Sequence, residues 1–347
     1  MNVKARVVIV DDSAAMRALL SKLLSQDPDI EVVGMAPEPH SARQMIKELN
    51  PDVVTLDVEM PGMDGLSFLE RIMRLRPMPV VMCSTLTARG AEATIEALRL
   101  GAVDCIAKPS GNPLEIAQDG ALLRKKVKMA ARSSVRATPA KVATPAPAAS
   151  TGGASAAAMR DAIIAVGAST GGVEALFSFI GALPPQCPPV LVVQHMPAVF
   201  TTGFAARLDR ETQVNVVEAQ DGMLVQPGTV YIAPGGERHM QLTGATGNKI
   251  RLVAGDPVSG HRPSVDVLFR SVAAFGSRAV GVIMTGMGAD GAEGLLEMRK
   301  AGARTFGQSR ETCVVYGMPR AANELGAVEK EMGLAAMPEA ILAACRK

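Results

Sequence analysis

The stretch "AIIAVGASTGG", residues 162–172, decides the fold of the second half of this chain of 347 residues. An apolar run that ends at Gly167 is followed by a turn of small residues, and this order predicts a buried strand, a tight turn at Ala168–Thr170 and a helix after Gly172. Ser169 would then lie where a strand ends and a helix begins. Free backbone N–H groups and the positive end of the helix dipole at such a place favour a developing oxyanion. The stretch therefore predicts an α/β unit with a candidate nucleophile in its first turn.

Two other interpretations of this turn are open. A glycine-rich loop could bind phosphate, although the turn reads G-x-S-x-G-G rather than G-x-G-x-x-G and no P-loop lysine follows. The G-x-S-x-G at 167–171 is also the pattern of α/β-hydrolases, whose triad runs serine, acid, histidine and whose oxyanion hole uses a loop upstream of the nucleophile. Here the serine follows the first strand of its block, so the block contains no such upstream loop. This absence disfavours the α/β-hydrolase fold.

Two further residues at predicted strand ends favour the interpretation of Ser169 as a nucleophile. In "VLVVQHM" the strand ends at His195. In "VGVIMTGMGADG" it ends near Thr285, and Asp290 lies on the glycine-rich turn that follows. Serine, histidine and aspartate on three strand-end loops can converge as nucleophile, general base and orienting acid. His239 and His261 are alternative candidates for the histidine, and the polar turn "DPVSGHRPSVD" around His261 could form a rim that faces the substrate.

Apolar runs alternate with amphipathic segments along two blocks of the chain, which indicates α/β folds. The first block predicts a doubly wound parallel sheet with strands at 5–12, 30–36, 52–58, 79–85 and 102–108. The second block predicts a mostly parallel sheet with strands at 162–169, 189–196, 229–235, 279–287 and 303–309. Some runs within 213–253 look like hairpin strands, so this second sheet could be mixed.

Composition divides the chain and excludes several classes of protein. Residues 133–158 are mostly Ala, Ser, Thr, Pro and Gly and are expected to form a linker. It separates a domain at 1–132 from a domain at 159–347. A net charge of +2 is too small to indicate nucleic-acid binding, and no apolar run is long enough to insert in a membrane. Scattered cysteines without a C-x-x-C pair and the lack of a signal peptide are typical of a cytoplasmic protein.

Acidic residues at strand ends of the first block predict a second site. Asp11 and Asp12 end the first predicted strand, and Asp57 ends the third in "TLDVEMPGMDG". The carboxyl ends of parallel strands share one edge, so these carboxylates should converge there as oxygen ligands for Mg²⁺. Ser84 would add a hydroxyl and Lys108 an ammonium at the same edge. Together these groups are what the formation and retention of an aspartyl phosphate require.

The motifs "VDDS", "LDVEMPGMDG" and "KP" resemble those of the receiver domain of bacterial response regulators, across residues 4–130. The resemblance implies that Asp57 accepts a phosphoryl group from a histidine kinase and that Asp11 and Asp12 help to hold Mg²⁺. Many receiver domains carry an aromatic residue three positions before the lysine, where this chain has Cys105.

The motifs "VGASTGG", "VVQHM", "HRPSVDVLF", "TGMGADG" and "VVYGMPRAA" are similar to those of the catalytic domain of chemotaxis protein-glutamate methylesterases. The resemblance implies hydrolysis of glutamate γ-methyl esters on chemoreceptors, and often deamidation of receptor glutamines, without a cofactor. It assigns Ser169 as nucleophile, His195 as general base and Asp290 as its orienter. The backbone N–H groups of Met287 and Thr170 would form the oxyanion hole. Phosphorylation of the first domain would then activate the second.

Two rival functions belong to other classes. A response regulator whose second domain binds DNA would need a compact helix-turn-helix with a basic face, whereas this block alternates strands with helices. A phosphorylation-controlled scaffold with a degenerate active site is harder to exclude, but all three candidate triad positions carry suitable residues.

Overall fold

The computed structural model describes residues 4–60, 64–85, 87–133, 135 and 161–346. Contacts divide the chain into two units, residues 1–141 and 142–347. The predicted linker at 133–158 lies almost entirely outside the described residues. No described helix is both long enough and apolar enough to cross a membrane.

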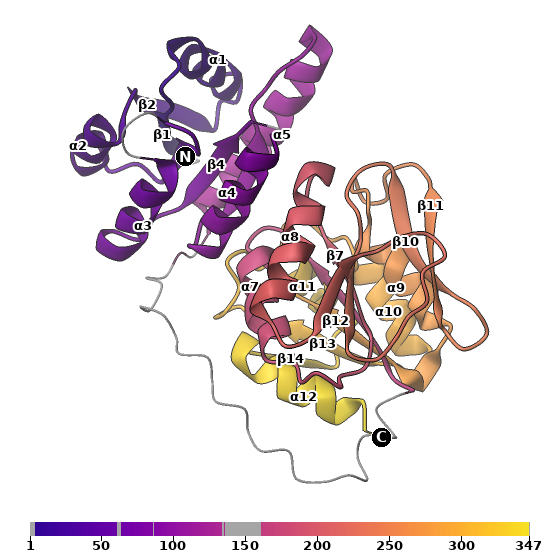
Figure 1. The fold of residues 1–347 in the computed structure, drawn as a ribbon. Coiled ribbons are helices and arrows are strands. Elements are labelled where there is room, and N and C mark those ends of the chain that lie inside the picture. The colour runs from indigo at the N-terminus through magenta and orange to yellow at the C-terminus, as the bar shows by residue number, and fades with distance from the viewer. Residues whose placement is uncertain (1–3, 61–63, 86, 134, 136–160, 347) are drawn as a thin grey trace. The chain divides into compact units, whose positions relative to one another are not determined.

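The N-terminal unit is a five-stranded parallel sheet between two layers of helices (Figure 1). Its strands are β1 (Ala5–Val10), β2 (Ile30–Ala36), β3 (Val53–Asp57), β4 (Val80–Ser84) and β5 (Asp104–Ala107). Its helices are α1 (Ala14–Leu24), α2 (Pro39–Leu49), α3 (Gly65–Leu75), α4 (Ala88–Arg99) and α5 (Pro113–Ala131). The strand order β2-β1-β3-β4-β5 confirms the predicted doubly wound sheet. This order reverses between β1 and β3, which is where ligands bind in folds of this kind.

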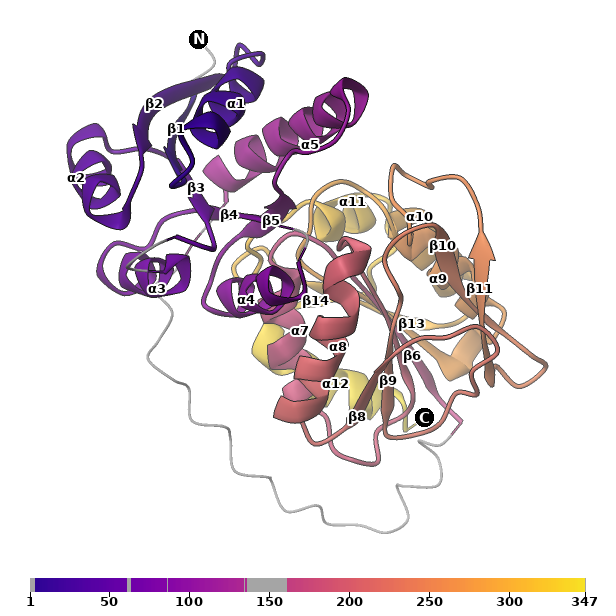
Figure 2. The same ribbon diagram turned by 45° about the horizontal axis from the view of Figure 1, so that its top comes forward.

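The C-terminal unit is built around a seven-stranded sheet (Figure 2). The strands of this sheet are β6 (Ile163–Ala168), β7 (Val190–Gln194), β8 (Asn215–Glu218), β9 (Thr229–Ile232), β12 (Ala279–Ile283), β13 (Arg304–Gln308) and β14 (Lys330–Met332). Every pairing along the order β14-β13-β12-β6-β7-β9-β8 is parallel. The chain adds strands on one side of β6 and then on the other, so the switch point lies between β6 and β12.

Helices cover both faces of the seven-stranded sheet. They are α7 (Gly172–Gly181), α8 (Ala198–Glu211), α9 (Val265–Ala273), α10 (Ala292–Lys300), α11 (Met318–Glu324) and α12 (Met337–Ala344), with short 3₁₀ helices η1 (Gly276–Arg278) and η2 (Leu334–Ala336). Helices α7, α8 and α12 pack together, and α9, α10 and α11 form a second layer. Between α9 and the sheet lies a core of Val265, Leu268 and Phe269, all fully buried.

The predicted hairpin is present but does not belong to the main sheet. Strands β10 (Arg238–Thr243) and β11 (Lys249–Ala254) pair antiparallel as a separate two-stranded sheet. The pattern within 213–253 had suggested a mixed sheet. The seven-stranded sheet is instead entirely parallel, because β8 and β9 pair parallel within it. The apolar runs of β8 and β9 are short, and such runs do not reveal whether two strands pair parallel or antiparallel.

Candidate active site

The turn after β6 has the predicted form and is fixed from both sides. Ser169 N–H donates to the carbonyl of Thr285 at 3.0 Å, beyond the end of β12. Gln194, the last residue of β7, donates its side-chain amide to the carbonyl of Ser169 at 2.9 Å. The turn thus bridges the ends of the two strands that flank β6, and Ser169 lies buried at the switch point with 8 % of its surface exposed.

Glycine is required at the end of this turn for two reasons. Gly171 has φ of 75°, in the left-handed region that other residues avoid. A Cβ at this position would also lie 2.5 Å from Cβ of Val314. The first glycine of "STGG" therefore permits a tight entry into α7 shortly after the serine.

His195 and Asp290 form a hydrogen-bonded pair beside this turn. His195 follows β7, and its backbone N–H donates to the carbonyl of Ala168, the residue before Ser169. Nε2 of its imidazole lies 2.8 Å from Oδ2 of Asp290. Among the residues that the structure describes, Nδ1 of His195 has no hydrogen-bond partner. The imidazole therefore uses one nitrogen to bind the carboxylate and keeps the other available to accept a proton.

Asp290 is a buried carboxylate that accepts hydrogen bonds at both oxygens. Oδ2 also accepts from the backbone N–H of Val265 at 2.8 Å, and Oδ1 accepts from Oγ of Ser264 at 2.7 Å and from N–H of Asp266 at 3.1 Å. Burial favours the neutral acid, but the bond and charge of His195 and the bonds from Ser264 and Val265 outweigh it. They hold the pKa of Asp290 below its ordinary value. A stable anion therefore faces the imidazole.

The amino end of α9 supplies these donors, and sequence reasoning did not identify it. Ser264 is the N-cap of α9 and also bonds Asp290. Its signal in the sequence, a serine just before an apolar helical run, indicates a helix start but not a contact 26 residues away.

His239 and His261, the alternative candidates for the histidine, make other contacts. Nδ1 of buried His239 accepts from the N–H of Ser264 at 3.1 Å, and Nε2 faces the carbonyl of Asp256 at 3.0 Å. Backbone groups thus occupy both of its nitrogens, so His239 supports the loop that leads to α9. His261 stacks on His195, with ring centroids 3.7 Å apart and planes inclined by 1°. It covers one face of the candidate base.

The residues assigned to the oxyanion hole lie next to the serine along the chain or in space. Thr170 directly follows Ser169, and its carbonyl accepts from Oγ1 of Thr285 at 3.0 Å. Met287 follows Gly286, and a Cβ added at Gly286 would lie 2.7 Å from Cβ of Ser169. The segment that carries the Met287 N–H therefore passes directly against the serine.

The acids of the N-terminal unit converge as predicted. Ligand oxygens of Asp11, Asp12 and Asp57 all lie within 4.8 Å of one another. Nζ of Lys108 lies 2.9 Å from Oδ2 of Asp11 and 2.7 Å from Oδ2 of Asp57. Burial lowers the pKa of Lys108, but its bonds to the two acids outweigh burial and raise it. Burial conversely raises the pKa of Asp57, which the lysine opposes.

This cluster fits a magnesium ion. Its three carboxylates are the hard oxygen donors that Mg²⁺ prefers, and Asp12 is exposed, which suits an ion that keeps several waters. Ser84 lies at the end of β4, as predicted. Its buried hydroxyl donates to the carbonyl of Thr85 at 3.1 Å or of Gly90 at 3.2 Å. Cys105 is also buried, and burial raises the pKa of its thiol to about 12.

Comparisons with known proteins cover both units. The CheB methylesterase family matches residues 164–341, and the response regulator receiver domain matches residues 7–118. A protein-glutamate methylesterase/protein-glutamine glutaminase of Caulobacter vibrioides is 59 % identical over 98 % of this chain and 97 % of its own length. One from Rhizobium johnstonii is 54 % identical over 99 % of this chain and 97 % of its own length. The methylesterase catalytic domain of Thermotoga maritima CheB superposes with a TM-score of 0.51 at 38 % identity, over 52 % of this chain and 97 % of that domain.

Proposed function

The chain belongs to the CheB methylesterase family, with a response regulator receiver domain before the methylesterase domain, and on this premise we propose that it is a phosphorylation-activated receptor methylesterase. It hydrolyses γ-methyl esters of glutamates on chemoreceptors and deamidates receptor glutamines. The observation that carries the proposal is the His195–Asp290 pair at the strand ends beside Ser169, with Nδ1 of the imidazole left available.

The reaction begins when Oγ of Ser169 attacks the ester carbonyl. The Oγ proton passes to Nδ1 of His195, and the carbonyl π electrons move to oxygen to give a tetrahedral oxyanion. The buried anion of Asp290 stabilises the imidazolium that forms. Backbone N–H groups of Thr170 and Met287 stabilise the oxyanion, a role worth on the order of 10²–10³ in kcat for one such donor.

Collapse of the oxyanion breaks the bond to the methoxy group, which takes the proton from His195 and leaves as methanol. Water then attacks the acyl-serine, again losing a proton to His195, and the receptor glutamate is released with Ser169 restored. A glutamine side chain follows the same steps with ammonia as the leaving group. The cycle needs no cofactor, because the chain's own groups move every proton.

Control comes from the receiver domain. A carboxylate oxygen of Asp57 attacks the phosphorus of a phosphohistidine on a histidine kinase, and the kinase imidazole leaves. Asp11, Asp12 and Asp57 would hold Mg²⁺, which when bound neutralises charge on the phosphoryl oxygens. Lys108, already between Asp11 and Asp57, would retain the phosphoryl group through an ion pair. The phosphorylated receiver then raises the activity of the methylesterase domain.

The test measures methanol and ammonia released from chemoreceptor membranes, with methylated and with glutamine-bearing receptors. We expect both products, and faster release when acetyl phosphate and Mg²⁺ are added. Asp57→Asn should keep the unstimulated rate and lose the stimulation. Absence of methanol release would overturn the esterase assignment, and equal stimulation of Asp57→Asn would overturn the control.

A further inference from the structure

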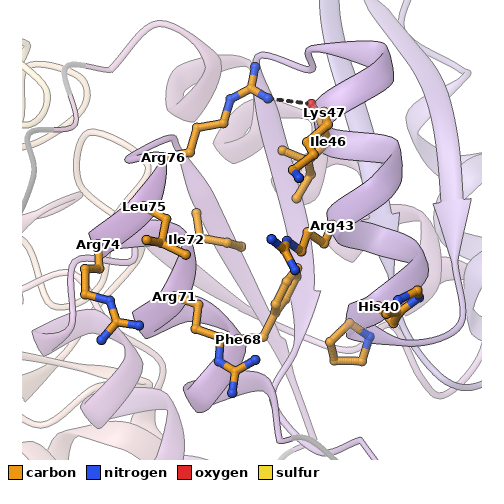
Figure 3. A pocket seen from close by; sticks show the side chains of 11 residues that line it. His40, Arg43, Ile46, Lys47, Phe68, Arg71, Ile72, Arg74, Leu75 and Arg76 are labelled. Atoms are coloured by element: carbon orange, nitrogen blue, oxygen red, sulfur yellow. Dashed lines mark hydrogen bonds between the residues drawn. The ribbon is translucent and has the colours of Figure 1, made fainter.

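A groove of about 590 Å³ runs between α2 and α3 of the N-terminal unit, and neither the catalytic chemistry nor the phosphoacceptor uses it (Figure 3). Its floor is apolar. Ile46 of α2 and Phe68 and Ile72 of α3 are each about 95 % buried and close the bottom of the groove. Leu75, at the end of α3, is 68 % exposed at its rim. The groove thus offers a recessed apolar surface with one prominent leucine.

Cations line both walls of the groove. Arg43 and Lys47 lie one turn apart on α2, and Arg71 and Arg74 lie on α3. All four are exposed, and within the described part of the chain none of their side chains has an ion pair or a hydrogen bond. No Asp or Glu belongs to the lining. The fifth cation, Arg76, donates to the carbonyl of Ile46 at 2.9 Å and so joins the two helices.

Like charges that face one another across a groove disfavour the close approach of two helices. This electrostatic repulsion is offset when a ligand brings negative charge to both walls. The lining therefore indicates a ligand with carboxylates or phosphates on two sides and apolar groups between them.

We propose that this groove docks an acidic amphipathic helix of a partner protein. Helices bind grooves through apolar side chains at positions i, i+3 or i+4, and i+7, which span about 10 Å. Such a ridge would reach Phe68 and Ile72, and Asp or Glu on its flanks would pair with Arg43 on one wall and Arg71 on the other. The proposal does not depend on the methylesterase reaction.

The recessed floor favours this occupant over a membrane or a nucleic acid. A lipid surface is nearly flat and would contact only the rim of the groove. Single-stranded nucleic acids bind by stacking bases on exposed aromatic rings, and Phe68 is only 4 % exposed. A helix can place side chains into the groove while its charged flanks remain at the level of the cations.

The test uses the full chain and a fluorescein-labelled synthetic helix with leucines at i, i+3 and i+7 and glutamates on both flanks, followed by fluorescence anisotropy. We expect saturable binding that weakens with salt. Arg43→Glu combined with Arg71→Glu should weaken it at least about tenfold, because two attractions between the arginines and the glutamates of the peptide become repulsions. Lys22→Glu combined with Lys125→Glu is the control, since both lysines are exposed on other helices of the same unit.

Two further comparisons locate the helix in the groove. A peptide with lysines in place of the glutamates should bind the Arg43→Glu/Arg71→Glu variant and not the wild type. Leu75→Ser should weaken binding of the acidic peptide. Leu114→Ser, which changes a leucine that is 69 % exposed on α5, should not. Phosphorylation of Asp57 by acetyl phosphate verifies that every variant is folded.

Three results would overturn the proposal. The first is a dissociation constant for the acidic peptide above about 1 mM, which corresponds to about −4 kcal/mol. The second is equal binding by wild type and the double glutamate variant. The third is that the wild type binds phosphatidylglycerol vesicles or polyuridylate, that the double glutamate variant does not, and that the acidic peptide fails to displace either ligand from the wild type.

Discussion

Replacing Asp290 by asparagine should damage activity and stability by amounts that its hydrogen bonds define. Four donors point at the carboxylate: His195 Nε2 and Val265 N–H at Oδ2, and Ser264 Oγ and Asp266 N–H at Oδ1. Asparagine has one acceptor oxygen, so its NH₂ group must face one of these pairs of donors. Each of its two orientations leaves a buried donor without an acceptor.

The two orientations have different consequences. With the NH₂ group at the Oδ1 position, the Ser264 hydroxyl can turn to accept, but the Asp266 N–H loses its partner. With the NH₂ group at the Oδ2 position, the Val265 N–H loses its partner and His195 must accept at Nε2. His195 would then carry its proton on Nδ1 and could not act as a base. A buried N–H without an acceptor costs about 1–3 kcal/mol, which is the expected fall in the free energy of unfolding.

The fall in activity should be much larger. The variant lacks the anion that stabilises the imidazolium, and amide replacement of the acid in a Ser-His-Asp arrangement lowers kcat by on the order of 10⁴. Methanol release from methylated receptors measures this change. Both tyrosines, Tyr231 and Tyr316, lie in the C-terminal unit and the chain has no tryptophan, so tyrosine fluorescence during urea denaturation reports the stability of that unit.

Asp221→Asn is the matched control. The Asp221 carboxylate accepts one backbone N–H, from Leu252 at 2.8 Å, on the exposed surface of the same unit. This variant should keep the wild-type rate and lose little stability. If Asp290→Asn keeps more than a tenth of the wild-type rate, or unfolds at the same urea concentration as wild type, the assigned role of the carboxylate is wrong.

Three further predictions follow from particular contacts. Gly286→Ala would place a Cβ 2.3 Å from Sδ of Met318 and 2.7 Å from Cβ of Ser169. The flexible methionine can give way but the serine backbone cannot, so displacement of the serine should slow methanol release by up to about 10²-fold, whereas an unchanged rate would refute the close packing. Lys108→Met removes the ammonium that bridges to Asp57, so acetyl phosphate should no longer stimulate methanol release, and retained stimulation would refute its role. Because the folded-state pKa of Asp290 is lowered, its charge stabilises the fold above the ordinary value of about 3.9, and this contribution is lost as pH falls through the lower folded pKa. In that range wild type should lose stability with falling pH more steeply than Asp290→Asn, as urea unfolding at several pH values would reveal, and parallel curves would contradict the lowered pKa.

The elements that the sequence predicted well are those with a local signal. Buried parallel strands appear as continuous apolar runs, and the glycines around Ser169 mark a strand-to-helix turn. Because parallel strands share one carboxyl edge, the ends of these runs also indicated that His195 and Asp290 lie near the serine. The shared edge follows from the parallel topology of the sheet, so the proximity of His195 and Asp290 to Ser169 could be inferred without knowledge of side-chain contacts.

Contacts between distant segments could not be predicted in this way. The direction in which β8 and β9 pair depends on the path of the chain between them, and their short apolar runs carry no sign of it. The carboxylate of Asp290 is held by the start of α9, and the N-cap pattern of Ser264 predicts only a helix boundary. Which nitrogen of His195 faces the acid depends on packing around the ring, including the stack with His261.

The Ser84 hydroxyl illustrates the same limit in the N-terminal unit. Its position at the end of β4 was predicted, but its hydroxyl faces the carbonyls of Thr85 and Gly90. A strand-end position defines where a residue lies, whereas its rotamer and the neighbouring helix define the direction of its side chain.

The most direct test of the central claim is the initial rate of methanol release by Ser169→Ala, with methylated receptor membranes, acetyl phosphate and Mg²⁺ present. The proposed nucleophile is absent in this variant, while His195 and Asp290 should remain paired. The account predicts release at least 10³-fold slower than wild type, about 4 kcal/mol in the barrier. Release within tenfold of the wild-type rate would show that Ser169 is not the nucleophile and would contradict the account.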